Sequence, residues 1–98
     1  MTKQLFVKRA IQVLGGDEYT LAYYELHESK TGYLQTGVFV SKSTGMVYRF
    51  TSAYKNYIKM TYLNDIGIVR TYDLYYDENG KLDAESYYKQ VESYLNNK

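Results

Sequence analysis

The chain has 98 residues, a net charge of +1 at neutral pH and no cysteine. This length supports one hydrophobic core, so we expect a single domain over residues 1–98, and the lack of cysteine excludes disulfides and thiolate metal sites. The near-neutral charge argues against a DNA mimic, which needs a dominant acidic surface, and against a histone-like DNA binder, which needs a dominant basic one.

Residues 3–14 show the repeat of an amphipathic helix. The apolar residues at the spacing i, i+3, i+4, i+7 are Val7, Ala10, Ile11 and Leu14. Thr2 can cap the start of this helix, and Gly15 can adopt the positive φ that often ends one. A strand that turns at Gly15 is the alternative, because several of these residues are β-branched, but the spacing favours the helix.

Residues 18–28 are rich in Tyr and Leu, and their odd positions could form the core-facing side of a strand. A helical stripe through Tyr19, Tyr23 and Leu26 fits as well. The short length and the aromatic content favour the strand. A turn should follow it at Gly32, which supplies the positive φ that such turns need.

The clearest β signal covers residues 33–50. Two β-rich runs, YLQTGVFV and MVYRF, are joined by the five residues SKSTG, which predicts a hairpin. Gly37 lies inside the first run and indicates either a bulge or a close backbone approach.

Residues 51–63 fit two patterns, and we favour a short central helix. A threonine at the start can cap it, and the apolar residues that follow recur at helical spacing. The alternative is a strand, because Ile58 and Met60 also share one strand face. Either structure would place Lys55 and Lys59 on one side of the segment.

The remainder predicts a strand over residues 68–76, a turn at residues 77–80 and a C-terminal helix capped by Asp83. The helix should cover the sheet with an apolar stripe, which comprises Ala84, Tyr87, Tyr88, Val91, Tyr94 and Leu95. The predicted fold is therefore α+β, an antiparallel sheet of about four strands with an N-terminal helix, a short central helix and a C-terminal amphipathic helix packed on it.

The sequence carries no catalytic framework. His27 is the only histidine, so a multi-histidine metal site or a serine hydrolase triad cannot form within the chain. The residues around Gly80 resemble a calcium-binding loop, but Tyr75 and Ser86 stand where that loop needs strong carboxylate ligands. We therefore expect a non-enzymatic protein without a metal or another cofactor.

The basic stretch, residues 29–64, is the strongest functional signal. It holds five Lys or Arg residues and five of the fourteen tyrosines, and it has no Asp or Glu. Tyrosine rings beside cations are typical of protein interfaces, where the rings anchor the partner and the cations steer it. The six residues that we expect to bind a protein partner are Tyr48, Arg49, Tyr54, Lys55, Tyr57 and Lys59. The alternative is single-stranded nucleic acid, whose bases would stack on the tyrosines.

Two resemblances bear on function. The order of helix, strand and the hairpin GVFVSKSTGMVY looks like the small PepSY-type domains of Gram-positive surface proteins, over roughly residues 5 to 50. In size, composition and lack of catalytic motifs the chain is similar to phage-encoded inhibitors of the anti-CRISPR type. The second resemblance implies an inhibitor of a host protein such as a CRISPR-Cas effector.

We expect a cytoplasmic location without membrane contact, because no signal peptide and no apolar run of roughly 20 residues is present.

Overall fold

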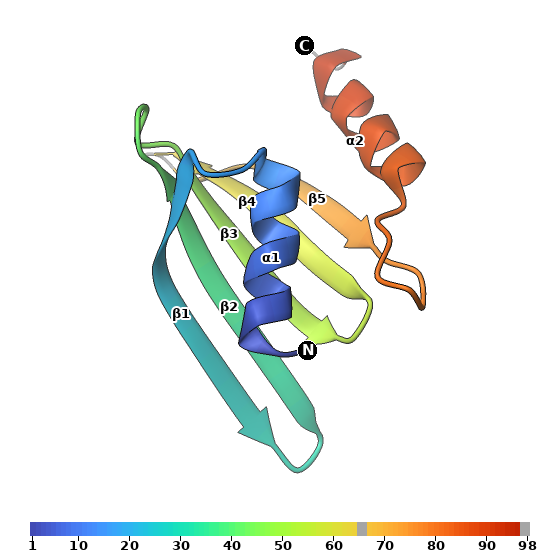
Figure 1. Cartoon of the computed structure of the whole chain (residues 1–98). Helices are drawn as coiled ribbons and strands as arrows, with labels where there is room; N and C mark the ends of the chain where they lie inside the picture. Colours follow the sequence, from blue (N-terminus) through green and yellow to red (C-terminus); the bar gives the residue numbers. More distant parts are fainter. Residues whose placement is uncertain (65–66, 97–98) are drawn as a thin grey trace.

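The computed structural model describes residues 1–64 and 67–96. Its elements in chain order are α1 (Lys3–Leu14), β1 (Tyr19–Ser29), β2 (Gly32–Ser41), β3 (Val47–Tyr54), β4 (Tyr57–Asn64), β5 (Gly67–Tyr75) and α2 (Ala84–Asn96). The strands form one antiparallel sheet in the order β1-β2-β3-β4-β5, in which each strand pairs with its neighbour in sequence. Figure 1 shows α1 lying across one face of this sheet and α2 lying beside β5.

The α+β class and both terminal helices are confirmed, but the sheet has five strands rather than about four. The predicted central helix is wrong. Residues 51–63 form the end of β3, a tight turn and strand β4 instead. The segment forms a strand because Ile58 and Met60 alternate with polar neighbours, and in a strand both side chains join the buried core cluster.

Helix α1 has the predicted caps at both ends. Oγ1 of Thr2 accepts a hydrogen bond from the amide of Leu5 at 3.2 Å, and Gly15 follows the helix with a φ of 94°. The amide of Gly15 also donates to the carbonyl of Ile11, which satisfies an acceptor at the helix end.

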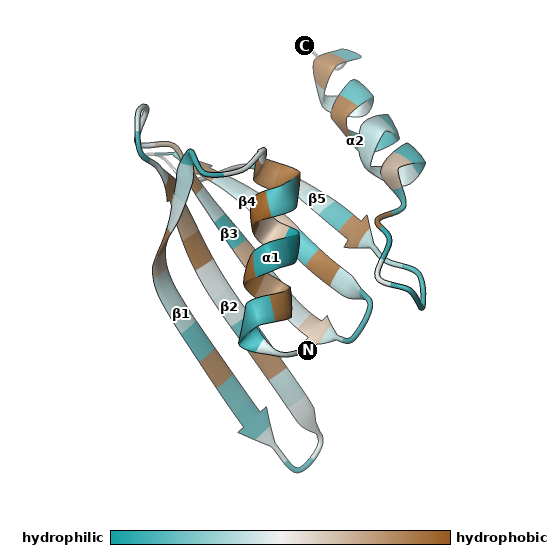
Figure 2. Cartoon of the chain, viewed as in Figure 1, coloured by the Kyte–Doolittle hydropathy of each residue, from teal (hydrophilic) through white to brown (hydrophobic). Residues whose placement is uncertain are grey.

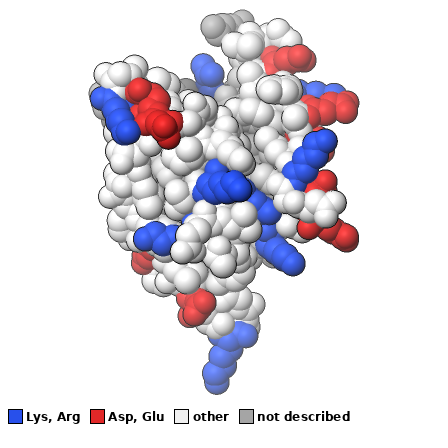
Figure 3. All heavy atoms as spheres, in the orientation of Figure 1, with Lys and Arg blue, Asp and Glu red and all other residues white. Residues whose placement is uncertain are grey.

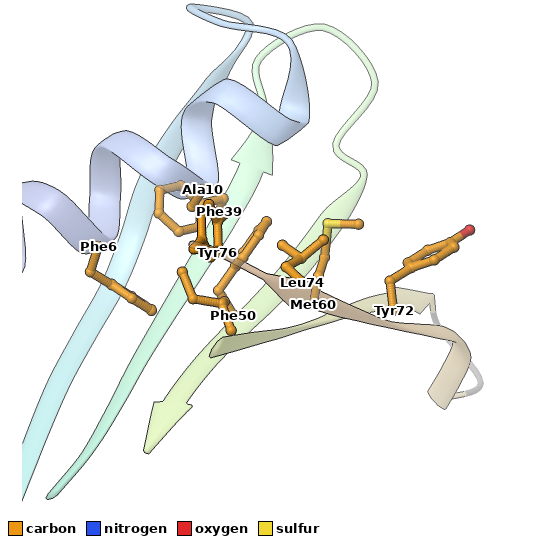
Figure 4. Packing of buried hydrophobic residues seen from close by; sticks show 9 residues of the cluster. Phe6, Ala10, Phe39, Phe50, Met60, Tyr72, Leu74 and Tyr76 are labelled. Atoms are coloured by element: carbon orange, nitrogen blue, oxygen red, sulfur yellow. The ribbon is translucent and has the colours of Figure 1, made fainter. Parts of the chain in front are cut away.

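The core lies between α1 and the sheet. Its most deeply buried side chains are Phe6, Ala10, Phe39, Phe50, Ile58 and Leu74. Figure 4 shows Phe6 and Ala10 of the helix meeting the phenylalanines of the strands, and Figure 2 shows apolar and polar residues alternating along the strands. Since a fully buried side chain of this size contributes about 1.5–3 kcal/mol, this cluster is the main stabilising feature.

At Gly37 a side chain of α1 lies directly against the sheet. A Cβ atom at this position would lie 2.8 Å from Cε2 of Phe6, so the ring occupies the space that a side chain would need. The neighbour of Gly37 is thus a side-chain ring, not the close backbone approach that the sequence offered as one explanation. The other explanation, a bulge at Gly37 itself, is also wrong, because the bulge of this strand pair lies in β1 between Leu21 and Tyr23.

Helix α2 is capped by Asp83, as predicted, through a bond of 3.1 Å from the amide of Ser86. Tyr87 and Val91 pack against the margin of the core. Tyr88 and Leu95 are 61% and 52% exposed, so the prediction that they cover the sheet is wrong. The reason is position, because α2 lies along the edge strand β5 and only one side of its apolar stripe reaches the sheet (Figure 1). Neither described helix has the length and hydropathy that crossing a membrane requires.

Candidate partner-binding surface

The two faces of the sheet have different roles. The inner face packs against α1 and carries the buried core, whereas no helix of the described chain lies on the outer face (Figure 1). An antiparallel sheet can expose one face in this way because its side chains alternate between the two sides. The alternation therefore decides which residues of the basic stretch can meet a partner.

The structure divides the six predicted binding residues between these faces. Arg49, Tyr57 and Lys59 occupy alternate positions to the buried Phe50, Ile58 and Met60, so their side chains lie on the outer face. Register supports this placement, since Lys59 pairs with Thr51, two residues from Arg49 on β3.

Tyr48 lies on the inner face, away from the other predicted anchors. Its ring packs against Tyr19 at 5.7 Å and against Tyr62 at 5.1 Å between centroids. Burial in this cluster raises the pKa of Tyr48 to about 12. We therefore assign Tyr48 to the packing of the inner face rather than to the outer surface.

Tyr54 reaches the outer face because of a bulge. The pairing of β3 with β4 shifts by one residue between Thr51 and Tyr54, and Tyr54 pairs with Tyr57. Without this extra residue, alternation would place Tyr54 on the inner face with Ser52. The hydroxyl of Ser52 stabilises the bulge, since it lies 3.0 Å from the carbonyl oxygen of Tyr54 and 3.1 Å from that of Tyr57.

Three tyrosines from three adjacent strands form a row at this end of the outer face. Tyr54 pairs with Tyr57, and Tyr57 pairs with Tyr75 of β5 at 5.3 Å between ring centroids. Tyr54 is 70% exposed and Tyr75 is 48% exposed. We call Tyr54, Tyr57 and Tyr75 the tyrosine row. Sequence reasoning missed Tyr75 because it lies outside the basic stretch and joins the row only through the pairing of β4 with β5.

Polar contacts hold the middle of the row in place. The hydroxyl of Tyr57 donates to Oδ1 of Asp73, which pairs with Lys59 across the strands. Burial and this hydrogen bond raise the pKa of Tyr57 above its ordinary value, so its hydroxyl remains a donor at neutral pH. The outer surface thus combines a fixed central ring, two exposed rings and the cations of Lys59 and Arg49.

Lys55 occupies the turn between β3 and β4 and belongs to a different surface. Together with Lys8 and Arg9 of α1 it lines a hollow on the inner side of the sheet. Its carbonyl accepts a hydrogen bond from Nη1 of Arg9 at 3.2 Å, which ties the turn to α1. Of the six predicted residues, the structure places Arg49, Tyr54, Tyr57 and Lys59 on the outer face, with Arg49 at a distance along β3 from the tyrosines, and it places Tyr48 and Lys55 elsewhere.

The described residues offer no group of three or more His, Cys, Asp or Glu side chains that could hold a metal ion. His27 lies near the tip of the β1-β2 hairpin, where its side chain is exposed and pairs with Glu25.

Comparison of the chain with protein-family models, with curated proteins and with solved structures found no match in any of the three. The function of this chain is therefore inferred from its residues and their geometry.

Proposed function

We propose that this protein is a non-enzymatic binding module that docks the outer face of its sheet onto a protein partner. The observation that carries the proposal is the tyrosine row, in which two of three adjacent rings are about half exposed or more. Large aromatic rings at the surface lose little conformational entropy on binding and are the most frequent hot spots of protein interfaces.

The cations on the outer face favour a partner with an acidic surface. Lys59 is exposed and Arg49 is half-buried on the same face, while the nearest carboxylate of β5, Asp73, already accepts from Tyr57. Cations at the border of an aromatic patch increase the association rate with an acidic partner. In this proposal the rings supply affinity and the two cations supply orientation.

We further propose that the partner is a host protein, such as a CRISPR-Cas effector, which this protein inhibits in the cytoplasm. The support is the resemblance in size and tyrosine-rich composition to phage-encoded inhibitors. Blocking a partner surface needs no catalytic group, so the lack of catalytic motifs in the sequence agrees with this mode of action.

The test uses the protein as bait. We expect the tagged wild-type chain to retain a stoichiometric protein from a lysate of the host organism, identified by mass spectrometry. The double variant Tyr54→Ala/Tyr75→Ala should bind that protein about thirtyfold or more weakly, as expected when a hot spot is lost. Tyr88→Ala is the matched control, because Tyr88 is 61% exposed on α2 and lies away from the outer face. Equal binding by the double variant and the wild type would refute the proposal.

A second candidate function is the binding of single-stranded nucleic acid. The observation that favours it is the same row, since adjacent tyrosines on an open antiparallel sheet can stack successive bases while Lys59 and Arg49 neutralise phosphates. This function predicts an affinity for labelled oligonucleotides that falls steeply with added salt and falls again in Tyr54→Ala. Fluorescence anisotropy that shows no binding at low salt would exclude it.

A further inference from the structure

The inner side of the sheet holds a site that is independent of the tyrosine row. A hollow of about 640 Å³ lies between α1, the β3-β4 turn and the loop between β5 and α2. A smaller hollow of about 130 Å³ reaches from there toward Tyr76. Arg9 and Gly80 line both hollows, so the guanidinium of Arg9 lies where the two meet.

Arg9 is a buried cation without a carboxylate partner among the described residues. It is 5% exposed, although arginine is among the residues that are rarely buried unless paired. Its guanidinium lies 4.3 Å from the ring centroid of Tyr76, and Nη1 donates to the carbonyl of Lys55. These contacts orient the group, but a ring face and a neutral carbonyl leave most of its charge uncompensated.

Two buried donors at this point have no partner in the described part of the chain. They are Nε of Arg9 and the hydroxyl of Tyr76. Burial raises the pKa of Tyr76 to about 12, so its hydroxyl keeps its proton at neutral pH. Since unpaired buried donors are rare in folded proteins, two of them beside one uncompensated cation indicate that an acceptor is missing.

Gly80 lies against the remaining edge of the guanidinium, and its lack of a side chain leaves space beside Nη2. A Cβ atom at Gly80 would lie 3.1 Å from Nη2 of Arg9, so any larger residue would press against this nitrogen. Nη1 already donates to the carbonyl of Lys55. The remaining edge, formed by Nε and Nη2, has two parallel N–H groups, the arrangement with which arginine binds two oxygens of one anion.

Basic side chains outnumber acidic ones in the walls of the larger hollow. Lys8 and Lys55 lie on its rim and are exposed, and Glu78 is the one acidic side chain that lines it among the described residues. Figure 3 shows the basic side chains as a run that crosses from α1 toward the β3-β4 turn on this face. An anion that approaches Arg9 would therefore meet a positive field.

We propose that these hollows form a binding site for an oxyanion, a carboxylate or phosphate group, held by the Nε edge of Arg9 and the hydroxyl of Tyr76, with Lys8 and Lys55 at the entrance. Both free donors then gain an acceptor, and the buried positive charge gains a counterion. The site lies on the inner side of the sheet, so it neither requires nor excludes the function proposed for the outer face.

The experiment is an NMR titration of the ¹⁵N-labelled protein with sodium phosphate, with sodium acetate and, at matched ionic strength, with sodium chloride. We expect saturable shifts of the Arg9 Nε–H and Gly80 amide signals with at least one oxyanion and not with chloride. Tighter binding of phosphate than of acetate would assign a phosphate ligand, and the reverse order would assign a carboxylate. Shifts that stay linear, or that chloride reproduces, would overturn the site and leave hollows filled by water only.

Variants separate the site from general charge. Arg9→Gln should weaken oxyanion binding about tenfold or more, the usual effect of losing a hydrogen bond to a charged group. Because Arg9 is buried and its loss could unfold the protein, Lys8→Ala and Lys55→Ala provide the decisive surface variants, which should weaken binding without lowering the melting temperature. Arg49→Gln is the matched control, since Arg49 also has an unpartnered buried Nε but lies on the outer face. Equal weakening by Arg49→Gln, or no weakening by either lysine variant, would contradict the proposal.

Discussion

Gln90 of α2 closes the outer edge of strand β5 at Asp73. The amide of Asp73 donates to Oε1 of Gln90 at 2.6 Å, and Nε2 of Gln90 donates to the carbonyl of Asp73 at 2.7 Å. Tyr94 acts in the same way at Thr71, where its hydroxyl lies 3.0 Å from both the amide nitrogen and the carbonyl oxygen. Two side chains of α2 thus occupy backbone groups that a sixth strand would otherwise pair with, which protects this edge from pairing with another chain.

Replacing Gln90 should loosen α2 from the sheet. We expect Gln90→Ala to lower the free energy of unfolding by about 1–2 kcal/mol, because two hydrogen bonds to the backbone of Asp73 are lost and water can replace them only in part. Urea denaturation followed by circular dichroism measures this change. The control is Lys89→Ala on the exposed side of α2, which removes only a surface ion pair with Glu85 and should stay within about 0.5 kcal/mol of the wild type. Equal stability of the two variants would show that the Gln90 contacts do not hold the helix.

A side chain at Gly37 should lower the stability of the domain, because the ring of Phe6 fills the space that it would need. We expect Gly37→Ala to destabilise the domain by about 1–3 kcal/mol, since the new methyl group would lie 2.8 Å from a fully buried ring. Gly32→Ala is the matched control in the same strand, because no atom lies within 4 Å of its added Cβ. Thermal unfolding of both variants tests the prediction, and an equal melting temperature for both would contradict the packing of Phe6 on β2.

Glu18 should make the stability of the protein depend on acid. Hydrogen bonds from Ser41 and Ser43 lower the pKa of Glu18 from 4.5 to about 2. Since its pKa is lower in the folded state than in the unfolded state, Glu18 contributes stability above pH 4.5, and this contribution is lost as the pH falls toward 2.

Two measurements check this prediction. The side-chain carboxyl ¹³C signal of Glu18 should titrate well below those of ordinary glutamates. The melting temperature of Glu18→Gln should fall less steeply between pH 5 and pH 2 than that of the wild type, whereas Glu92→Gln on the exposed side of α2 should keep the wild-type slope. A wild-type slope in Glu18→Gln would show that the link between Glu18 and the β2-β3 loop contributes nothing.

Ser52 should control the order of the hairpin tip that presents Tyr54. Ser52 is 1% exposed, and its hydroxyl contacts the carbonyls on both sides of the turn, so Ser52→Ala should lower the free energy of unfolding by about 1 kcal/mol. We expect faster amide hydrogen exchange at Lys55 and Tyr57 in this variant, while exchange in α1 stays as in the wild type. Ala53→Ser, a change at the exposed neighbour, should leave the exchange rates unaltered. Unchanged exchange in Ser52→Ala would mean that strand pairing alone maintains the bulge.

The sequence by itself determined the two helices and the β2-β3 hairpin. Residues 3–14 and 84–96 repeat their apolar side chains at helical spacing and carry caps at Thr2 and Asp83, so local chemistry specifies both helices. The β2-β3 hairpin follows equally from two β-rich runs around SKSTG. These elements depend on interactions between residues that are close in the chain, which a sequence pattern records directly.

Only the tertiary structure decided the segment 51–63, the faces of the sheet and the candidate sites. The apolar residues of that segment fit helical and strand spacing alike, and the pairing of β4 with both β3 and β5 selects the strand. The bulge before Tyr54 changes the face on which this ring lies, and the pairing with β5 brings in Tyr75. Likewise, α1 must pack on the sheet before Arg9 meets Lys55 and Tyr76. Each of these outcomes depends on register or packing between distant residues, so no local pattern in the sequence encodes it.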